Sequence, residues 1–431
     1  MNPAIITSVM AMQMSTDQPT PAVQAVVTTA GGAVATAAIG ELYSTSRYAP
    51  KYLYDGEASY FGKGVAQAVR IVQDVVAPAV VGLAADDQSA VDGAIRQALE
   101  EAGIAPCVNL TAPVSVAALK AAGEAHDLGL YRHLGGRAAF MLPVGGHAAA
   151  SGSKRYGALA RPDDRPVFAL VAHGFASFAE AQYGLWETFN AYDALLSEKF
   201  DILAQRGYML NIPAGKVNDD EELLKLMVQG IEIAGHTGRI GIHLDAGANA
   251  YYDAENQCYR GLFSAADKSG ADLLALYERW LAQYPIVILE DPFHQDDVDG
   301  FRTLCAQSGI QIVGRDLFGA DVARIKRCID AGCVNAVSVS LCTFETVSDL
   351  IEVTRYAKNR NVDVMPRYDG GEGVQTVADL AVGLCAGTLC LGGMDATSNR
   401  LIAIEQEIGP RARFYGGRGI KGARFSLRGE G

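Results

Sequence analysis

Residues 285–291 read PIVILED and residues 310–316 read IQIVGRD. Each stretch is a short run of mostly branched apolar residues that ends in charged side chains, which is typical of a strand buried on both faces of a parallel sheet. Glu290 and Arg315 lie 25 positions apart near the ends of these runs, and Ser340 follows after 25 more. A strand, a loop, a helix and a return loop take about that length. The spacing therefore predicts a serial βα array.

Similar apolar runs extend this array along the chain: IGIHLD at 240–245, AVSVSL at 336–341, VDVMPRY at 362–368 and TLCLGG at 388–393. Such an array most often closes into an α/β barrel whose active site lies at the carboxyl ends of the strands. An open doubly wound sheet is the alternative, but no GxGxxG sequence follows any of the runs. The polar residues at the strand ends are therefore the candidates for chemistry. They are Asp245, Glu290, Asp291, Arg315, Asp316, Ser340, Cys342, Arg367, Tyr368, Asp369 and Cys390.

The first 135 residues follow a different pattern, in which strand-like and helical stretches are mixed. Residues 22–39 predict two short strands broken at a Gly-Gly pair, and helical patterns cover 63–81 and 89–103. Residues 113–125 predict an alanine-rich helix with its proline in the first turn, where a missing N–H costs nothing. The Gly-, Ala- and Ser-rich passage 144–158 has the composition of a boundary loop.

Composition excludes several classes of protein. The chain has 431 residues, 49% of them hydrophobic and 20% charged, which suits a globular protein with a large core. A net charge of −13 argues against nucleic acid or an anionic membrane as the main partner. No apolar run reaches the roughly 20 residues that cross a bilayer. The eight cysteines show no CxxC spacing, so we expect free thiols and a cytoplasmic setting.

Several motifs resemble those of enolase, in the same order over nearly the whole chain. They are YFGKGV (60–65), VAPAVVG (76–82), LYRHLGG (130–136), LEDPFHQDD (289–297), IQIVGRDL (310–317), DLAVGLCAGTL (379–389) and IEQEIG (404–409). The resemblance implies an α+β N-terminal domain over 1–135 that caps an eight-stranded α/β barrel over 136–431. It also implies a homodimer or a larger homo-oligomer.

Enolases remove a proton next to a carboxylate, using a lysine base and Mg²⁺ ions held by three carboxylates. The first two metal carboxylates fall on Asp245 and Glu290. The third falls on Arg315, because the family reads VGDDL where this chain reads VGRDL. The two active-site lysines fall on Ser340 and Cys390. The resemblance therefore implies an enolase scaffold with a rewritten centre.

Other parts of the family's site are also changed. The phosphate-contacting SHRS stretch falls on residues 367–370, which read RYDG, so a histidine, an arginine and a serine are lost. The two acidic loops align near Val167 and residues 212–216, where their glutamates are missing. The mobile loop that closes over the substrate falls on residues 40–44 and does not match. A phosphate-binding site is therefore not expected.

A guanidinium at the third strand end opposes a metal ion. A unit charge pair about 4 Å apart is worth about 4 kcal/mol at an effective dielectric near 20. We therefore predict a metal-free cluster of Asp245, Arg315 and Glu290, with Mg²⁺ weak or absent. The alternative is that Asp316 replaces the lost ligand and completes a site with Asp245 and Glu290.

Several residues keep two interpretations. Arg315 either binds a substrate carboxylate or fills the vacated metal site with an ion pair. Cys390 is either a nucleophile or acid–base group, or a small core residue. Tyr368 either exchanges protons or packs in the mouth. Arg367 either binds substrate or pairs with Asp369, and His243 is expected to be a hydrogen-bonded core histidine.

The sequence leaves three functions open. We predict a repurposed lyase or isomerase acting on a small carboxylate, with Arg315, Tyr368 and Cys390 as catalytic residues and Arg315 and Arg367 as substrate-binding residues. The first alternative is a catalytically inactive pseudoenolase that serves as a scaffold or ligand sensor. The second is phosphopyruvate hydratase activity with relocated catalytic groups.

Overall fold

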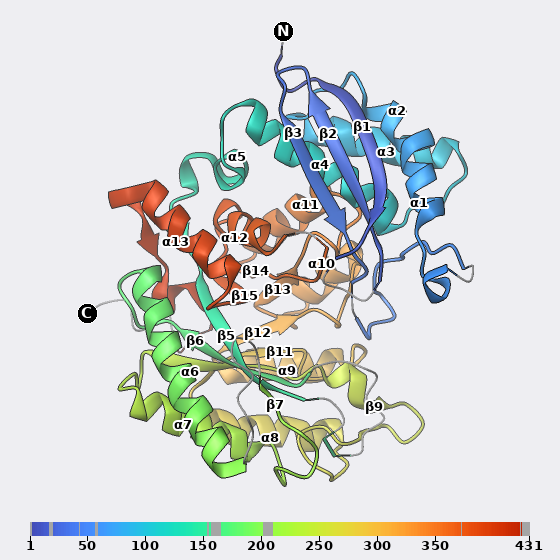
Figure 1. Ribbon diagram of the computed structural model, residues 1–431. Coiled ribbons are helices and arrows are strands. Elements are labelled where there is room, and N and C mark those ends of the chain that lie inside the picture. The colour runs from blue at the N-terminus through green and yellow to red at the C-terminus, as the bar shows by residue number, and fades with distance from the viewer. Residues whose placement is uncertain are drawn as a thin grey trace.

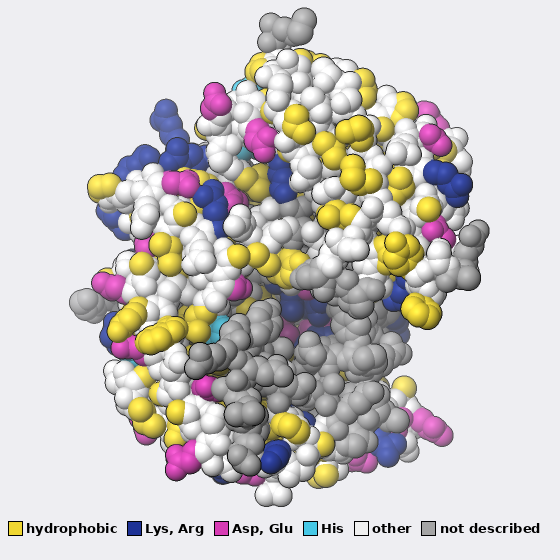
Figure 2. Space-filling view, viewed as in Figure 1, with side chains coloured by type: hydrophobic (Ala, Val, Ile, Leu, Met, Phe, Trp, Pro, Cys, Tyr) yellow, Lys and Arg dark blue, Asp and Glu magenta, His cyan; other side chains and the backbone are white. Residues whose placement is uncertain are grey.

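The computed structural model of the protein describes residues 2–16, 20–42, 44–56, 59–152, 155–156, 165–200, 210–371, 373–422 and 424. Figure 1 shows two parts, an N-terminal sheet with helices and a barrel with helices around it. Charged side chains gather in the hollow between the two parts (Figure 2). The architecture is the predicted α/β barrel with an α+β capping domain, and the strand runs proposed from the sequence are all confirmed as strands.

The N-terminal part is built on a three-stranded antiparallel sheet with the order β1-β2-β3. Alternate side chains of β2 are fully buried because one face of the sheet lies against helix α4. The strands and helices of this part are β1 (Ile6–Met14), β2 (Ala22–Thr29), β3 (Val34–Ile39), η1 (Ser59–Gly62), α1 (Ala66–Ile71), η2 (Val72–Val76), α2 (Ala77–Val80), α3 (Gln88–Glu101), α4 (Val108–Ala125), α5 (Leu130–Gly135) and η3 (Gly136–Ala138).

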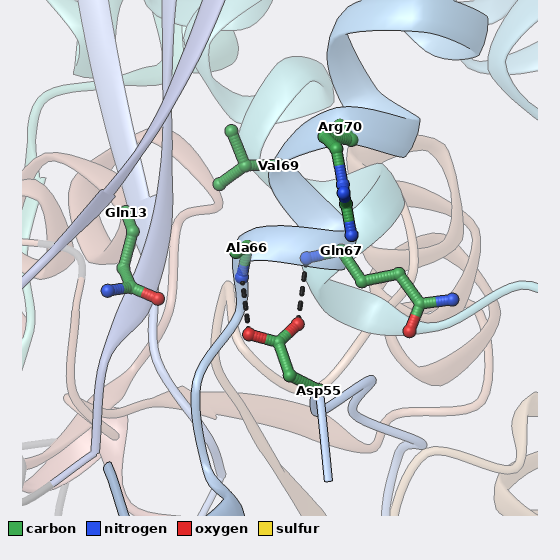
Figure 3. A pocket seen from close by; sticks show the side chains of 6 residues that line it. All are labelled: Gln13, Asp55, Ala66, Gln67, Val69 and Arg70. Carbon is green, nitrogen blue, oxygen red and sulfur yellow. Dashed lines mark hydrogen bonds between the residues drawn. The ribbon is translucent and has the colours of Figure 1, made fainter. Parts of the chain in front are cut away.

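Asp55 fixes the start of the helical run formed by α1, η2 and α2. Its carboxylate accepts hydrogen bonds from the backbone N–H groups of Ala66 at 2.9 Å and Gln67 at 2.7 Å (Figure 3). These donors have no partner within a helix, so the side chain satisfies them. A pocket lies beside this cap, with Gln13 and Arg70 among its lining residues. The acid in this pocket is engaged in capping, which gives it a structural role.

The predicted start of helix α4 was wrong. The helix begins at Val108, so Pro113 lies inside it rather than in the first turn. Proline removes a backbone donor within the helix. Two contacts hold the first turn in place: Val108 donates to the Lys51 carbonyl at 2.9 Å, and the Asn109 side chain bonds both backbone groups of Leu53. Burial of most of the helix further offsets the lost hydrogen bond.

Eight strands form a nearly closed barrel in the order β14-β13-β12-β11-β8-β6-β5-β15, and β14 and β15 at the two ends lie next to each other. The short strand β7 pairs with β5. The strands are β5 (Val144–Ser151), β6 (Val167–Ala172), β7 (Leu210–Asn211), β8 (Ile240–Asp245), β11 (Ile286–Glu290), β12 (Gln311–Gly314), β13 (Ala336–Val339), β14 (Asp363–Pro366) and β15 (Thr388–Gly392). Two small pairs lie outside the barrel, β4 (Met141–Leu142) with β16 (Arg413–Phe414) and β9 (Tyr252–Asp253) with β10 (Cys258–Tyr259).

Helices surround the barrel, and several begin at a side chain that accepts a hydrogen bond from the first turn. These capping residues are Ser269, Asp297, Asp321, Thr346 and Asp395. The helices are α6 (Phe178–Phe200), α7 (Glu221–Ile233), η4 (Ala248–Tyr251), α8 (Gly270–Gln283), α9 (Val298–Ser308), α10 (Val322–Asp330), α11 (Val347–Lys358), α12 (Val374–Gly383), α13 (Ala396–Ile408), η5 (Gly409–Arg411) and η6 (Gly416–Gly419). None of the described helices combines the length and apolar character needed to cross a membrane.

The array is not uniformly parallel, which corrects the simple βα pattern expected from the sequence. Strand β6 runs antiparallel to both of its neighbours, β5 and β8. Val167, the first residue of β6, lies beside Asp245, the last residue of β8. The amino end of β6 therefore lies at the same edge of the barrel as the carboxyl ends of the parallel strands.

The passage 144–158 is also not the predicted boundary loop. Residues 144–151 form β5, which is buried along its whole length. Small residues are needed there because neighbouring groups approach closely. A side chain at Gly146 would place its Cβ 2.8 Å from the Leu170 carbonyl oxygen. The glycine and alanine content that suggested a loop thus reflects tight packing in the barrel wall.

The N-terminal part is fixed to the barrel at helix α11. Asp92 on α3 accepts hydrogen bonds from both the backbone N–H and the hydroxyl of Ser348, and Ser115 on α4 accepts one from the Val347 N–H. These buried polar side chains bind the amino end of α11. The capping domain therefore has a defined position over the barrel mouth.

Candidate active site

Four polar residues meet at the mouth of the barrel. Asp245 and Glu290 end β8 and β11 and are direct partners in the register of these strands. Arg315 follows the last residue of β12, and Arg367 follows the last residue of β14. The structure thus brings together the strand-end residues that the sequence singled out, and their roles remain predictions.

Five carboxylates and three guanidiniums of the described residues form a continuous ion-pair network in this mouth. All eight side chains are at most 14% exposed, so solvent screens their charges poorly. We call this network the outer layer. Its members are Asp245, Glu290, Asp291, Asp316, Asp369, Arg165, Arg315 and Arg367.

Arg165 holds one side of the outer layer and was missed in the sequence. Its guanidinium lies 2.8 Å from Asp316, 3.3 Å from Asp291 and 3.8 Å from Asp245. It reaches the mouth because it directly precedes Pro166, just before the antiparallel strand β6 begins. A search limited to the carboxyl ends of strands excludes such a residue. A charged residue just before an apolar strand run is the signal that points to it.

Arg315 and Arg367 hold the other side, and both contact Asp369. Asp369 Oδ1 lies 3.1 Å from Arg315 Nη2 and 3.0 Å from Arg367 Nε. Arg367 also places Nη1 2.6 Å from Glu290 Oε1 and 4.0 Å from Asp245. The predicted pairing of Arg367 with Asp369 is therefore present. One carboxylate oxygen lies between two guanidiniums.

The predicted Asp245–Arg315–Glu290 cluster is part of a larger network, in which the charge of Arg315 lowers the pKa of Glu290. The cations beside the two acids are Arg367 and Arg165, whereas the ion pairs of Arg315 are with Asp369 and, at 3.9 Å, Asp316. The reason is the reach of Arg367, which enters from β14 across the mouth.

Asp316, considered from the sequence as a substitute metal ligand, is hydrogen-bonded to the N-terminal part, and a ligand role for it stays a prediction. Ser44 and Thr45 each donate a hydrogen bond of 2.8 Å to its carboxylate, which holds it against the loop that follows β3. The acid whose oxygen lies within 4.8 Å of those of Asp245 and Glu290 is Asp291. Tyr43, in the same loop, lies outside the described residues, as does residue 209 of the loop before α7.

The charges of the outer layer do not balance, and the pKa values respond. Burial, together with the charge of Glu290, raises the pKa of Asp245 to about 7. Burial and the charge of Asp316 raise the pKa of Asp291 to about 8. Burial also opposes ionisation of Glu290, but the charge of Arg367, the contact with His243 and the charge of Arg315 together outweigh it, and the pKa falls to about 2. Asp245 and Asp291 are therefore the carboxyl groups that take up protons most readily, which relieves the excess negative charge of the network.

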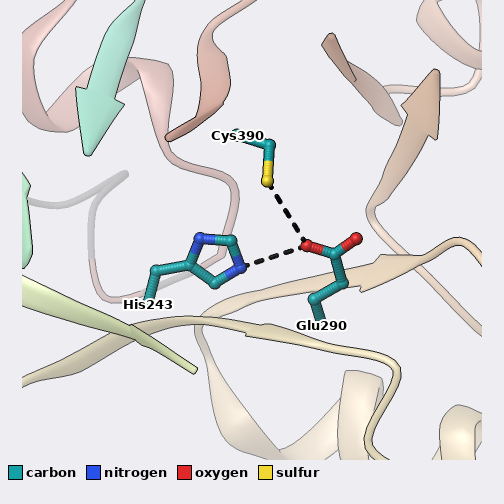
Figure 4. A group of neighbouring side chains, drawn as sticks. All are labelled: His243, Glu290 and Cys390. Carbon is teal, nitrogen blue, oxygen red and sulfur yellow. Dashed lines mark hydrogen bonds and ion pairs between the residues drawn. The ribbon is translucent and has the colours of Figure 1, made fainter. Parts of the chain in front are cut away.

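A second group of side chains lies on the inner side of Glu290. His243 Nε2 is 3.2 Å from Glu290 Oε2, and the Cys390 thiol is 3.8 Å from the same oxygen (Figure 4). His243 comes two residues before Asp245 on β8, and Cys390 lies on β15. We call these three residues the inner pocket. In the inner pocket, Cys390 and His243 both lie beside Glu290 Oε2.

Two other candidates have mainly structural surroundings. The Ser340 hydroxyl is 2.9 Å from that of Thr343, in keeping with a residue that fills space. Tyr368 is half-buried and packs against the hydrophobic core. These surroundings are consistent with structural roles, and the catalytic role predicted for Tyr368 stays a prediction.

Mg²⁺ does not fit the outer layer well. Asp245, Glu290 and Asp291 could offer three oxygens. However, Asp291 accepts the backbone N–H groups of Arg315 and Asp316, and Glu290 Oε1 is in contact with a guanidinium. The guanidinium and the backbone N–H groups take up the oxygens that an octahedral ion with hard ligands would need. The chemistry proposed below therefore uses no Mg²⁺.

The fold and the mouth together define a class: α/β-barrel proteins with an N-terminal capping domain and acids at successive strand ends. Comparison with known families agrees. A family model described as "Enolase, C-terminal TIM barrel domain" matches residues 159–423, and one described as "Enolase, N-terminal domain" matches residues 6–134. The chain belongs to the enolase family.

Two curated relatives extend over nearly the whole chain. An enolase of Methanopyrus kandleri is 32% identical over 435 residues, which cover 95% of this chain and 99% of the relative. An enolase of Methanococcus maripaludis is 31% identical over 418 residues, which cover 94% and 95%. The predicted family is therefore confirmed. Similarity at this level leaves open whether this member has kept the family's reaction.

Proposed function

We propose that the barrel mouth binds a small carboxylate between Arg315 and Arg367 and acts on it as a lyase or isomerase. The observation that carries this proposal is the position of Asp369 Oδ1, which lies about equally far from a nitrogen of each guanidinium. Paired arginines are well suited to carboxylates because their fixed N–H groups match the two oxygens. A substrate carboxylate would take the place of the Asp369 side chain.

The same two arginines suit the chemistry of proton removal next to a carboxylate. Losing that proton places a second negative charge on the bound carboxylate, and fixed positive charges stabilise it. Asp245 is the proposed proton acceptor, because its Oδ1 has no hydrogen-bond partner among the described residues. The electron pair left on carbon then either expels a group from the neighbouring carbon, as in a lyase, or takes up a proton elsewhere, as in an isomerase.

Ordinary dehydration of 2-phosphoglycerate is not expected. Ser340 and Cys390 stand where the resemblance puts the two lysines, and the buried Cys390 thiol has a pKa raised well above its usual value, mainly by burial. The stretch that would contact phosphate supplies Arg367 and Asp369, which are paired with each other. Relocated catalytic groups would have to replace all of these functions.

One observation favours a non-catalytic alternative. Every guanidinium of the outer layer is already in an ion pair with a protein carboxylate. A mouth satisfied in this way also suits a ligand sensor or scaffold, in which a carboxylate displaces Asp369 without further reaction. This alternative shares the binding step with the enzyme proposal and differs only in turnover.

Malonate binding tests the shared step. Calorimetry should detect malonate binding to the wild-type chain, and Arg315→Gln and Arg367→Gln should each weaken it by tenfold or more. Arg260→Gln, a change at an exposed ion pair with Asp253, is the matched control and should bind like wild type. Absence of wild-type binding, or equal binding by all variants, contradicts the proposal.

Exchange of carbon-bound protons tests the catalytic step. Succinate incubated with the protein in D₂O should gain deuterium next to a carboxylate, as followed by NMR. Asp245→Asn should stop the exchange while leaving malonate binding in place. Binding without exchange in the wild-type chain would favour the sensor over the enzyme.

A further inference from the structure

We propose that His243, Glu290 and Cys390 form a binding site for a divalent cation of the Zn²⁺ type. This inference goes beyond the proposed function and does not depend on it. The site uses the Glu290 oxygen that faces away from the arginines, together with a ring nitrogen and a sulfur from two other strands.

Two of the separations among the three ligand atoms are close to those of tetrahedral coordination. Figure 4 shows His243, Glu290 and Cys390 pointing toward one another from β8, β11 and β15. Their ligand atoms all lie within 4.8 Å of one another, with 3.2 Å from nitrogen to oxygen and 3.8 Å from sulfur to oxygen. Tetrahedral Zn²⁺ with bonds of about 2.0 to 2.3 Å holds such atoms about 3.3 to 3.6 Å apart. Shifts of a few tenths of an ångström would bring both contacts of Glu290 Oε2 into this range, and closure of the space between His243 and Cys390 onto the ion would complete the geometry.

An unsatisfied polar atom points into this space. His243 is 2% exposed, and its Nε2 has one polar neighbour among the described residues outside Cys390, the Glu290 Oε2 atom 3.2 Å away, in a contact without the geometry of a hydrogen bond. Buried nitrogens of this kind nearly always find a partner. A cation between His243, Glu290 and Cys390 would supply that partner, since neutral imidazole is a good ligand for zinc.

Arg367 prepares the carboxylate for this role. Its Nη1 lies 2.6 Å from Glu290 Oε1, which fixes the carboxylate and leaves Oε2 directed at His243 and Cys390. Residues that bind a metal ligand without touching the metal often contribute strongly to metal affinity. Arg367 thus has a positioning role toward this site, separate from its proposed contact with substrate.

The ligand types select the cation. Mg²⁺ prefers hard oxygen ligands in octahedral geometry, whereas a sulfur and an imidazole nitrogen favour Zn²⁺ or Co²⁺. Binding would break the S–H bond of Cys390, form a metal–sulfur bond and release the proton to solvent. The thiolate and Glu290 then balance the two charges of the ion. A fourth position is left for water or a ligand oxygen, as in zinc sites that act on substrates.

Titration of the tag-free, chelator-treated full chain with Co²⁺ tests the site. We expect one Co²⁺ per chain and a thiolate-to-cobalt charge-transfer band in the near ultraviolet. Cys390→Ser should abolish the band and weaken binding about 100-fold or more, and His243→Gln should weaken binding without removing the sulfur. Cys385→Ser is the matched control, because this partly exposed cysteine lies outside the inner pocket, and it should keep the band.

Three results would overturn the proposal: no Co²⁺ uptake by folded wild-type protein, uptake without a thiolate band, or a band that survives in Cys390→Ser. Circular dichroism establishes that each variant is folded before the comparison. Zn²⁺ should displace Co²⁺ and remove the band, whereas millimolar Mg²⁺ should leave it unchanged. Malonate binding is measured separately, so failure of the metal site and failure of the carboxylate site are distinguishable.

Discussion

The two oxygens of Glu290 face two different environments. Oε1 belongs to the outer layer, where a guanidinium lies 2.6 Å away and neighbouring charges are largely paired. Oε2 belongs to the inner pocket, where its neighbours are a histidine nitrogen and a thiol. The Glu290 carboxylate therefore belongs to both groups: one oxygen takes part in the ion pairs of the outer layer, and the other contacts His243 and Cys390 of the inner pocket.

This difference indicates which ligands each side can accept. The outer layer contains cations that could exchange one anion for another, because Asp369 already lies between two arginines. Among the described residues, the inner pocket supplies a ring nitrogen, a carboxylate oxygen and a thiol, which are donor atoms that suit a cation of the Zn²⁺ type. The predictions below test this contrast, from the largest expected effect to the smallest.

Turnover of 2-phosphoglycerate with Mg²⁺ should be lower than that of the Methanopyrus kandleri enolase by about 10⁴-fold or more. A positioned general base alone contributes about 10²- to 10⁴-fold, and the resemblance to the family places Ser340 and Cys390 at the positions of the two lysines. Formation of phosphoenolpyruvate, followed by ultraviolet absorbance, measures the rate. A Mg²⁺-dependent rate similar to that of the relative would show that the outer layer still acts as a metal-dependent enolase site.

Arg165→Met should lower the free energy of unfolding by about 3 to 5 kcal/mol, because it leaves Asp291 and Asp316 buried without their cation. Urea denaturation followed by circular dichroism measures the change. Arg47→Met is the control, since this arginine is 59% exposed in its pair with Asp296 and should cost less than about 1 kcal/mol. Equal losses in the free energy of unfolding for the two variants would mean that the ion pairs of the outer layer contribute no more to stability than an exposed ion pair.

Zn²⁺ at 100 times its dissociation constant should stabilise the chain by about 2.7 kcal/mol, because only the folded state presents the three ligands together. Urea denaturation with and without the ion gives the value. Mg²⁺ at the same concentration should add little, and Cys390→Ser should remove the Zn²⁺ effect. Stabilisation by Zn²⁺ that persists in Cys390→Ser would place the cation outside the inner pocket.

Asp369→Asn should raise the affinity for malonate about tenfold, or about 1.4 kcal/mol, because the internal competitor loses its charge. Calorimetry measures the affinity. Asp299→Asn, at a side chain that is 83% exposed, is the control and should leave malonate binding unchanged. Weaker binding by Asp369→Asn would indicate that Asp369 supports the ligand instead of competing with it.

The sequence predicted the barrel because apolar runs of fixed spacing specify buried parallel strands. It also located Asp245, Glu290, Arg315 and Arg367, since strand ends gather at one edge of a barrel whatever the details of packing. Family motifs added the α+β capping domain. These features depend on local patterns, which a single chain reveals.

Features that depend on strand direction and side-chain reach could not be predicted in the same way. Arg165 enters the mouth only because β6 runs antiparallel, and β5 looked like a loop because tight packing demands glycine and alanine. The choice of Arg367 over Arg315 as the partner of Glu290 depends on distances across the barrel. His243 was expected to be a hydrogen-bonded core histidine; it is buried as predicted, and its contact with Glu290 Oε2 beside the Cys390 thiol appears only in three dimensions.

The segment that carries Asp369 is tied to the N-terminal domain by a close backbone contact. Gly371 has a φ of +82°, and a Cβ there would lie 2.7 Å from the Ala38 carbonyl oxygen, so a side chain would push the segment away from β3. Because it is tethered, the Asp369 carboxylate has a fixed effective concentration beside the two arginines. A free carboxylate must exceed a corresponding concentration before it displaces Asp369. A side chain at residue 371 would move the segment that carries Asp369. It would thereby change the concentration of free carboxylate needed to displace Asp369, without any change of Arg315 or Arg367.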